Sequence, residues 1–198
     1  MKMPFNFNGA LLLAGLFMAG MAGSVQANSI GLDLAVSDET ANFGVFMQDE
    51  SPVDSTRYAA HYFYNEPGDK LYSASMKVQR KGMAGNPNLD IGIKGKAYGF
   101  NQDSFNLDGF GLMLGVTARY WLDTQAPASV SVEALYSPEI VTSGDLNDAR
   151  ELGVRAEMQI LPTITGFVGF RYLALDLDQR SSYELDKNAN IGVEIILD

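Results

Sequence analysis

Side chains capable of acid–base or metal chemistry are scarce in this chain of 198 residues. There is one histidine, His61, and there are no cysteines. Without cysteine the chain has no thiolate nucleophile, no thiolate metal ligand and no disulfide. His61 is followed by Tyr62 and Phe63, so it lacks the nearby serine of a His-x-Ser dyad, and it is expected to form hydrogen bonds rather than act as a base. The sequence therefore predicts no enzyme, no metal site and no cofactor.

Isolated charged residues are the strongest chemical feature of the chain. The chain carries 24 Asp and Glu against 14 Lys and Arg, with a formal charge of −10, which argues against a nucleic-acid partner. Single charges nevertheless recur on the polar positions of alternating stretches, where cations outnumber anions. They are Asp33, Arg57, Lys77, Lys94, Lys96, Arg119, Glu133, Arg155, Glu157, Arg171 and Glu194.

The stretches that carry these charges alternate apolar and polar residues with a period of two, which is the pattern of half-buried strands. Turn residues such as Asn86-Pro87 separate them, and no segment has a convincing helical period. We expect ten strands, or eight if weak stretches fail, in one all-β domain at 28–198. The stretches are 29–37, 42–48, 56–65, 70–79, 90–100, 109–122, 129–137, 151–160, 163–175 and 190–197. A closed antiparallel up-and-down barrel accommodates them because closure removes both sheet edges.

The first 27 residues read as a secretory signal peptide. Lys2 precedes an apolar run at 10–22, and residues 25–27 (VQA) form a small-residue cleavage pattern. The run is too short to cross a bilayer as a helix, so we expect export of a mature chain that begins at Asn28.

The apolar face of the predicted barrel is expected to face lipid, so that Leu112, Leu114 and Val116 point outward. The opposite face carries Gly, Ala, Ser and isolated charges, which suit a narrow lumen better than a wetted exterior. Aromatic residues lie toward strand ends, where they could form interfacial girdles. The candidate girdle residues are Tyr58, Tyr64, Tyr72, Tyr120, Trp121, Tyr136 and Tyr172. Strands of about 9–11 residues are long enough to cross a membrane when tilted.

Two interpretations of the charged lumen stay open. A cation-rich constriction would make a narrow channel that favours anions, since rings of charge set selectivity in pores. An ion-pair network would instead fill the lumen and leave a structural membrane protein. Acids in the long connections could bridge divalent cations to lipopolysaccharide. These acids are Asp103, Asp108, Glu139, Asp145, Asp148, Asp176, Asp178, Glu184 and Asp186.

The leader ending at 25–27, the strand SIGLDLAVS at 29–37, the aromatic run at 58–64 and the GFGLMLGV strand from Gly109 together resemble YfaZ-type outer-membrane proteins of Gram-negative bacteria. This resemblance implies a small outer-membrane β-barrel, described as a predicted porin, with no established substrate or catalytic residues. Its surroundings would be outer-membrane lipid and lipopolysaccharide, and the barrel-assembly machinery would insert it. The chain departs from many outer-membrane strands because 195–198 (IILD) lacks the terminal aromatic residue read by that machinery.

Two alternatives remain. A soluble periplasmic, lipocalin-like ligand-binding barrel would place the apolar face inside. A barrel enzyme that modifies lipid A or phospholipid would depend on His61. The sequence does not predict an oligomeric state.

Overall fold

The structure, a computed structural model, describes residues 29–102, 107–177 and 180–197, so the predicted signal peptide lies outside the described residues. The described residues form β-strands joined by short connections. The strands are β1 (Ser29–Val36), β2 (Thr40–Glu50), β3 (Asp54–Asn65), β4 (Lys70–Arg80), β5 (Leu89–Gln102), β6 (Leu107–Leu122), β7 (Ala128–Ser137), β8 (Thr142–Gly144), β9 (Leu146–Leu161), β10 (Ile164–Leu177) and β11 (Arg180–Leu197). Two 3-10 turns, η1 (Met83–Gly85) and η2 (Glu139–Val141), lie in connections.

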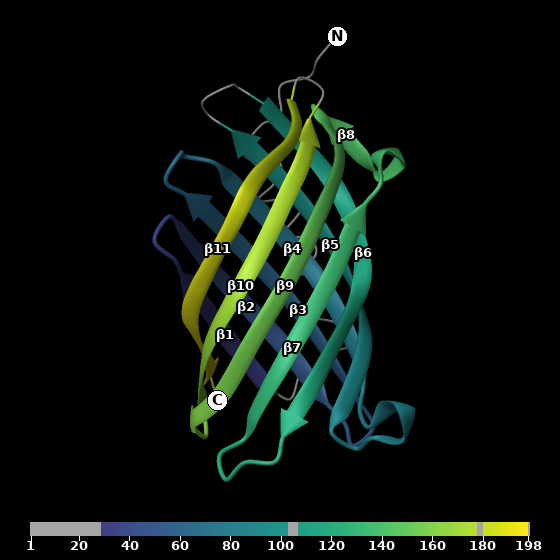
Figure 1. Cartoon of the computed structure of the whole chain (residues 1–198), viewed down its shortest axis with the longest axis vertical. Helices are drawn as coiled ribbons and strands as arrows, with labels where there is room; N and C mark the ends of the chain where they lie inside the picture. The colour runs from purple at the N-terminus through teal and green to yellow at the C-terminus, as the bar shows by residue number, and fades with distance from the viewer. Residues whose placement is uncertain (1–28, 103–106, 178–179, 198) are drawn as a thin grey trace.

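Antiparallel pairing runs around the whole molecule and closes it into a barrel (Figure 1). Strands β1 to β7 pair in chain order, β9 pairs with β7, and the series continues through β10 to β11. Closure comes from β1 and β11, where Ile30 lies opposite Leu197 and Val36 opposite Ile191. The short β8 only caps one end of β6. The predicted closed, antiparallel, ten-stranded barrel is therefore confirmed.

The two ends of the barrel differ, and we name them by the chain. The chain enters β1 and leaves β11 at the terminal end, which is marked by the C-terminus in Figure 1. The opposite end, where β8 lies, is the far end. Several strands continue further toward the far end than β1 does, because β1 has 8 residues and β11 has 18. The barrel wall is therefore lower at the β1–β2 hairpin than elsewhere.

Apolar side chains cover the outside of the barrel. On β6 the outward Leu114 is 74% exposed and its neighbour Leu112 is also exposed, whereas the inward Met113 and Thr117 are buried. This orientation is the one expected in lipid. It contradicts the soluble, lipocalin-like alternative, which needs these residues inside. In the part of the chain that the structure describes, no helix is long and apolar enough to span a bilayer.

The far end of the lumen is filled by apolar side chains, a feature that the sequence analysis did not predict. These buried residues pack into one cluster, here called the far-end cluster. Its members are Phe63, Leu71, Tyr98, Phe100, Leu107, Met113, Leu135, Leu146, Ala149, Leu173, Leu175, Leu177 and Leu185. Tyr98 lies over Gly111 of the next strand, where a Cβ atom would collide with its ring. The described apolar side chains therefore pack closely against one another across the lumen at this end.

The polarity of the two faces inverts along the longest strands. On β9 the inward Glu151 and Arg155 lie toward the terminal end, whereas the inward Ala149, nearer the far end, belongs to the far-end cluster. Outside, Leu152 is exposed, and Arg150 two residues nearer the far end is exposed as well. The far end is therefore built like a water-soluble barrel, and the rest is built like a membrane barrel.

Candidate functional site

A cavity of about 200 Å³ occupies the lumen between the far-end cluster and the terminal end. Seven cations and six carboxylates line it, and we call this space the charged cavity. The lining charges are Asp33, Arg57, Lys77, Lys94, Lys96, Arg119, Glu133, Glu151, Arg155, Glu157, Arg171, Asp186 and Glu194. The structure thus brings all eleven predicted lumen charges together and adds Glu151 and Asp186.

One group of charges is centred on Arg155, which β9 directs into the lumen. Its guanidinium lies 2.9 Å from Asp33, 2.9 Å from Glu194 and 3.0 Å from Glu157. Arg57 reaches Glu194 through two hydrogen bonds of 2.9 and 3.1 Å. Bidentate contacts of this kind combine charge with fixed geometry. The group therefore joins β1, β3, β9 and β11 across the closing seam of the barrel.

Aromatic rings complete the surroundings of these two arginines. The Arg57 guanidinium lies 3.7 Å from the centre of the Phe46 ring, and that of Arg155 lies 3.3 Å from the Phe167 ring. Both phenylalanines are buried. Such stacking favours arginine because its planar guanidinium presents a face to the ring while its edges bind carboxylates.

A second group of charges lies closer to the far-end cluster. Lys96 bonds Glu151 at 2.5 Å, and both side chains are about 95% buried. Arg171 approaches the other Glu151 oxygen at 3.0 Å and Asp186 at 3.7 Å. Charges this deeply buried must be paired, because an isolated one would cost several kcal/mol. This group therefore lies at the end of the charged cavity that is nearest to the far-end cluster.

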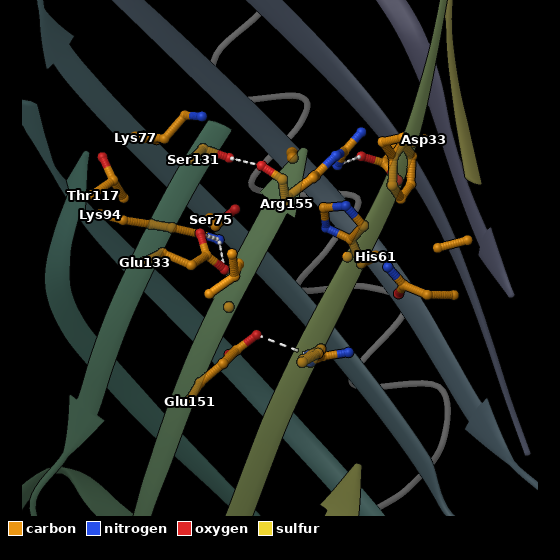
Figure 2. Close-up of a pocket in the computed structure, with 18 of the residues that line it drawn as sticks. Asp33, His61, Ser75, Lys77, Lys94, Thr117, Ser131, Glu133, Glu151 and Arg155 are labelled. Carbon is orange, nitrogen blue, oxygen red and sulfur yellow. Dashed lines mark hydrogen bonds and ion pairs between the residues drawn. The ribbon is translucent and has the colours of Figure 1, made fainter. Parts of the chain in front are cut away.

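Two more ion pairs involve side chains of β5, β6 and β7. Lys94 binds both oxygens of Glu133, at 2.8 and 3.1 Å. Arg119 lies 3.2 Å from Glu157, which Arg155 also contacts. The ion pairs thereby form three separate groups around the lumen, and Figure 2 shows the contacts of Glu133 with Lys94 and of Asp33 with Arg155.

Lys77 and His61 differ from the other basic residues of the cavity. Among the described residues, neither has a hydrogen bond or ion pair in the structure. His61 lies over Gly44 of β2, where a Cβ atom would overlap the imidazole ring. Lys77 lies on β4 directly opposite Arg57 and Lys94 of the neighbouring strands.

The candidate girdle residues fall into two sets. The six tyrosines occupy outward positions of their strands, and Tyr64, Tyr120 and Tyr136 are exposed. Tyr72 also packs against Tyr62, with ring centroids 5.1 Å apart. Trp121 instead donates a hydrogen bond of 2.7 Å from its indole nitrogen to the buried Asp90. It lines a hollow at the terminal end of the lumen rather than the lipid-facing surface.

Comparison with known proteins identifies the family. A family profile described as "YfaZ precursor" matches residues 10–197 of the chain. The chain belongs to the YfaZ family. None of the curated proteins compared with it matches.

Solved structures similar to this YfaZ-family barrel share little sequence with it. The KdgM porin in complex with disordered oligogalacturonate is 10% identical at a TM-score of 0.46, with 86% of this chain and 99% of the porin covered. The NanC porin is 12% identical at a TM-score of 0.43, with coverage of 85% and 100%. A bacterial polysaccharide outer-membrane secretin is 10% identical at a TM-score of 0.44, with 80% of this chain covered. The YfaZ-family chain spans 56% of the secretin.

The structure exposes some of the acids that were predicted to lie in outward connections and places another inside the lumen. Glu184 is exposed on β11, where it pairs with Lys187, and Asp176 pairs with the exposed Arg150. For Asp186 the prediction was wrong, because β11 begins at Arg180 and carries this residue into the lumen beside Arg171. Two of these acids, Asp103 and Asp178, lie outside the described residues.

Glu151 and Asp186 were missed for different reasons. Glu151 stands on the polar positions of an expected strand, and its parity with Arg155 could have assigned it to the lumen. Asp186 precedes the last expected strand, and a β-bulge next to Leu185 shifts the pairing with β10 there, so parity could not be extended back to it. With both acids included, cations exceed carboxylates in the cavity by one rather than by three.

Proposed function

We propose that this YfaZ-family barrel is a structural outer-membrane protein with a closed lumen, held in the bilayer by its outward apolar face. The observation that carries the proposal is the far-end cluster, in which Phe63, Leu71, Leu173 and Leu175 are each no more than 1% exposed. Packing this tight would leave no water-sized passage between the described side chains, because interiors of proteins are as dense as organic crystals.

The inversion of polarity supports a position in the membrane. Lipid would surround the region in which Leu114, Val154 and Phe170 face outward. The far end, with Arg150 and Glu184 outside, would stand among the headgroups and in water. Exposed acids there would bind divalent cations bridged to lipopolysaccharide.

Reaching this location requires export and insertion. The leader at 1–27 would direct the chain to the periplasm, and the barrel-assembly machinery would fold it into the outer membrane. The last strand offers outward Ile195 and Leu197 in place of a terminal aromatic residue.

A narrow anion-selective channel is the second candidate, favoured by the charged cavity. A path through it would pass the cations Arg57, Lys77, Lys94, Arg119 and Arg171. All of these except Lys77 are held by carboxylates, so the lumen has fixed ion pairs where a channel needs hydrated, mobile ions.

We propose no catalytic role for His61. A hydrolytic barrel enzyme needs a base joined to a nucleophile or to a carboxylate that orients it. No hydroxyl or carboxylate is bonded to His61 among the residues that the structure describes. The variant His61→Ala should therefore leave lipid A and phospholipid composition of the outer membrane unchanged.

Conductance in planar lipid bilayers tests the closed lumen. Purified barrel, shown to be folded by its heat-modifiable migration on gels, should insert without discrete current steps. The triple variant Phe63→Ala, Leu173→Ala, Leu175→Ala removes the centre of the far-end cluster and should produce steps. Reproducible steps from the wild-type protein, shifted in ion preference by Arg119→Gln or Arg171→Gln, would establish the channel instead.

A further inference from the structure

Lys77 is the one cation lining the charged cavity that forms no ion pair with the residues that the structure describes. Lys77 extends from β4 into the cavity, and no dashed line reaches it in Figure 2, whereas Glu133 and Asp33 are both joined to cations. The lining also holds one more cation than carboxylates. The one excess positive charge of the cavity can therefore be assigned to Lys77.

The nearby carboxylates cannot serve Lys77, because other cations already occupy them. Both oxygens of Glu133 are bound by Lys94. Glu157 lies between Arg119 and Arg155, at 3.2 and 3.0 Å. The remaining acids belong to the Arg155 group or to the Lys96–Glu151 group described above.

The residues beside Lys77 add positive charge instead of neutralising it. Arg57 and Lys94 stand directly opposite it on β3 and β5. Three cations in a row across neighbouring strands repel one another, and carboxylates pair only with the outer two, Arg57 and Lys94. Lys77, between them, is left without a carboxylate of its own among the described residues.

Hydroxyl groups in the same cavity complete the set of donors. The Thr117 hydroxyl is buried, has no hydrogen-bond partner, and belongs to a residue only 5% exposed. Ser75 is buried two residues before Lys77 on the same face of β4 and also lines the cavity. An ammonium group with free hydroxyl donors is a combination that binds carboxylates and other small oxyanions.

The charged cavity adjoins a hollow at the terminal end of the lumen. Gln79 and Arg119 line both the charged cavity and the hollow that contains Trp121 and Asp90. Entry of a small solute from this side would not require passage across the far-end cluster. At about 200 Å³, the space suits a small organic acid rather than an oligosaccharide.

We propose that the charged cavity binds one small monovalent carboxylate, held by Lys77 with hydroxyl donors from Thr117 and Ser75, and admitted from the terminal end. A single negative charge balances the one excess cation. The site is independent of the seal at the far end, so it stands whether or not the barrel conducts.

Fluorine NMR with trifluoroacetate tests the proposal on the folded barrel in detergent micelles and chloride-free buffer. The wild-type protein should broaden the trifluoroacetate resonance in a saturable manner, and trifluoroethanol, its uncharged analogue, should show no such effect. Lys77→Met should weaken binding at least tenfold, whereas Lys77→Arg should retain it. Lys187→Met is the matched control, because it removes an exposed cation outside the cavity and should bind like the wild type.

Thermal unfolding provides a second readout that does not depend on detecting the ligand. Acetate should raise the Tm of the wild type and of Lys187→Met but not that of Lys77→Met, since a ligand stabilises only the state that binds it. Without acetate, Lys77→Met should unfold at or above the wild-type temperature, because the variant no longer holds an unpartnered charge. Absence of saturable binding by the wild type, or equal binding by Lys77→Met, would overturn the proposal.

Discussion

The two ends of this barrel fill the same kind of confined space in opposite ways. At the far end, large apolar side chains such as Phe63 and Leu173 interlock and exclude water. Toward the terminal end, the same strands carry arginines, lysines and carboxylates that bind one another, with Arg155 and Glu151 at the centres. The strands are continuous through both regions, so the difference lies entirely in the side chains.

The contrast shows how the outside environment selects the inside of a barrel. Where the outside is apolar, the inward positions are polar and pair by charge, because all available hydrophobic burial is directed to lipid. Where the outside carries Arg150 and Glu184, inward neighbours such as Ala149 and Leu185 are apolar, as in a protein dissolved in water. In the proposed placement, the inversion marks the level at which the strands leave the bilayer.

Removal of the central arginine should have the largest effect on the charged region. Arg155→Met leaves Asp33, Glu157 and Glu194 with fewer partners, and breaking a buried ion network costs about 3–5 kcal/mol. The free energy of unfolding, measured with urea in lipid vesicles, should fall by that amount. Arg150→Met, an exposed arginine on the same strand, should change it by less than about 1 kcal/mol. Equal effects of the two variants would show that the network does not stabilise the barrel.

The apolar region should respond to the loss of volume. Leu173→Ala removes a side chain that is fully buried in the far-end cluster, and such cavities typically cost about 3 kcal/mol. The outward Leu152→Ala should cost about 1 kcal/mol or less, since lipid chains can occupy the vacated space. Both values come from the same urea experiment. A smaller loss for Leu173→Ala than for Leu152→Ala would contradict the packed seal.

The outer surface should distinguish lipid from water. Leu114→Arg places a cation on the most exposed leucine of β6 and should destabilise the barrel by about 2 kcal/mol, within the range for lipid-facing charges. Glu184→Arg, at an exposed position of β11 nearer the far end, should cost about 1 kcal/mol or less. If the two variants unfold at the same urea concentration, the proposed membrane boundary is misplaced.

The exposed ion pairs should contribute least. Lys187→Met removes the partner of Glu184, and surface pairs of this kind are worth about 0.5 kcal/mol or less. The effect should disappear in high salt, which screens exposed charges. Stability measured across a salt series would show whether Lys187 lies in water as proposed, because a buried pair keeps its contribution under these conditions.

The sequence predicted the strands well where outward residues face lipid, because there apolar and small residues alternate. In β6, the alternation of Leu112, Leu114 and Val116 with small residues fixes both the strand and its orientation. In β11, residues 181–187 would lie outside the bilayer in the proposed placement, so neither face needs to be apolar and the alternation disappears. The strand therefore starts ten residues earlier than the pattern indicates.

The sequence predicted most of the charged residues that line the cavity, but it could not predict which of them form ion pairs with one another. Parity places Arg57 and Glu194 on inward positions, yet their contact depends on closure between the first and last strands, which are far apart in the chain. The far-end cluster was hidden for a related reason. Phe63 and Met113 stand on the polar positions of their strands, and only the three-dimensional arrangement shows that such exceptions gather at one end.

The seam between β1 and β11 has a consequence for biogenesis. Seven residue pairs close the barrel, and they join the first strand of the described chain to the last. Contacts of this sequence separation are slow to form, because the intervening chain must first be ordered. The cylinder can be completed only after the final strand has been synthesised. Until then, β1 presents an unpaired edge that other chains could join, so a nascent chain needs an escort up to the moment of closure.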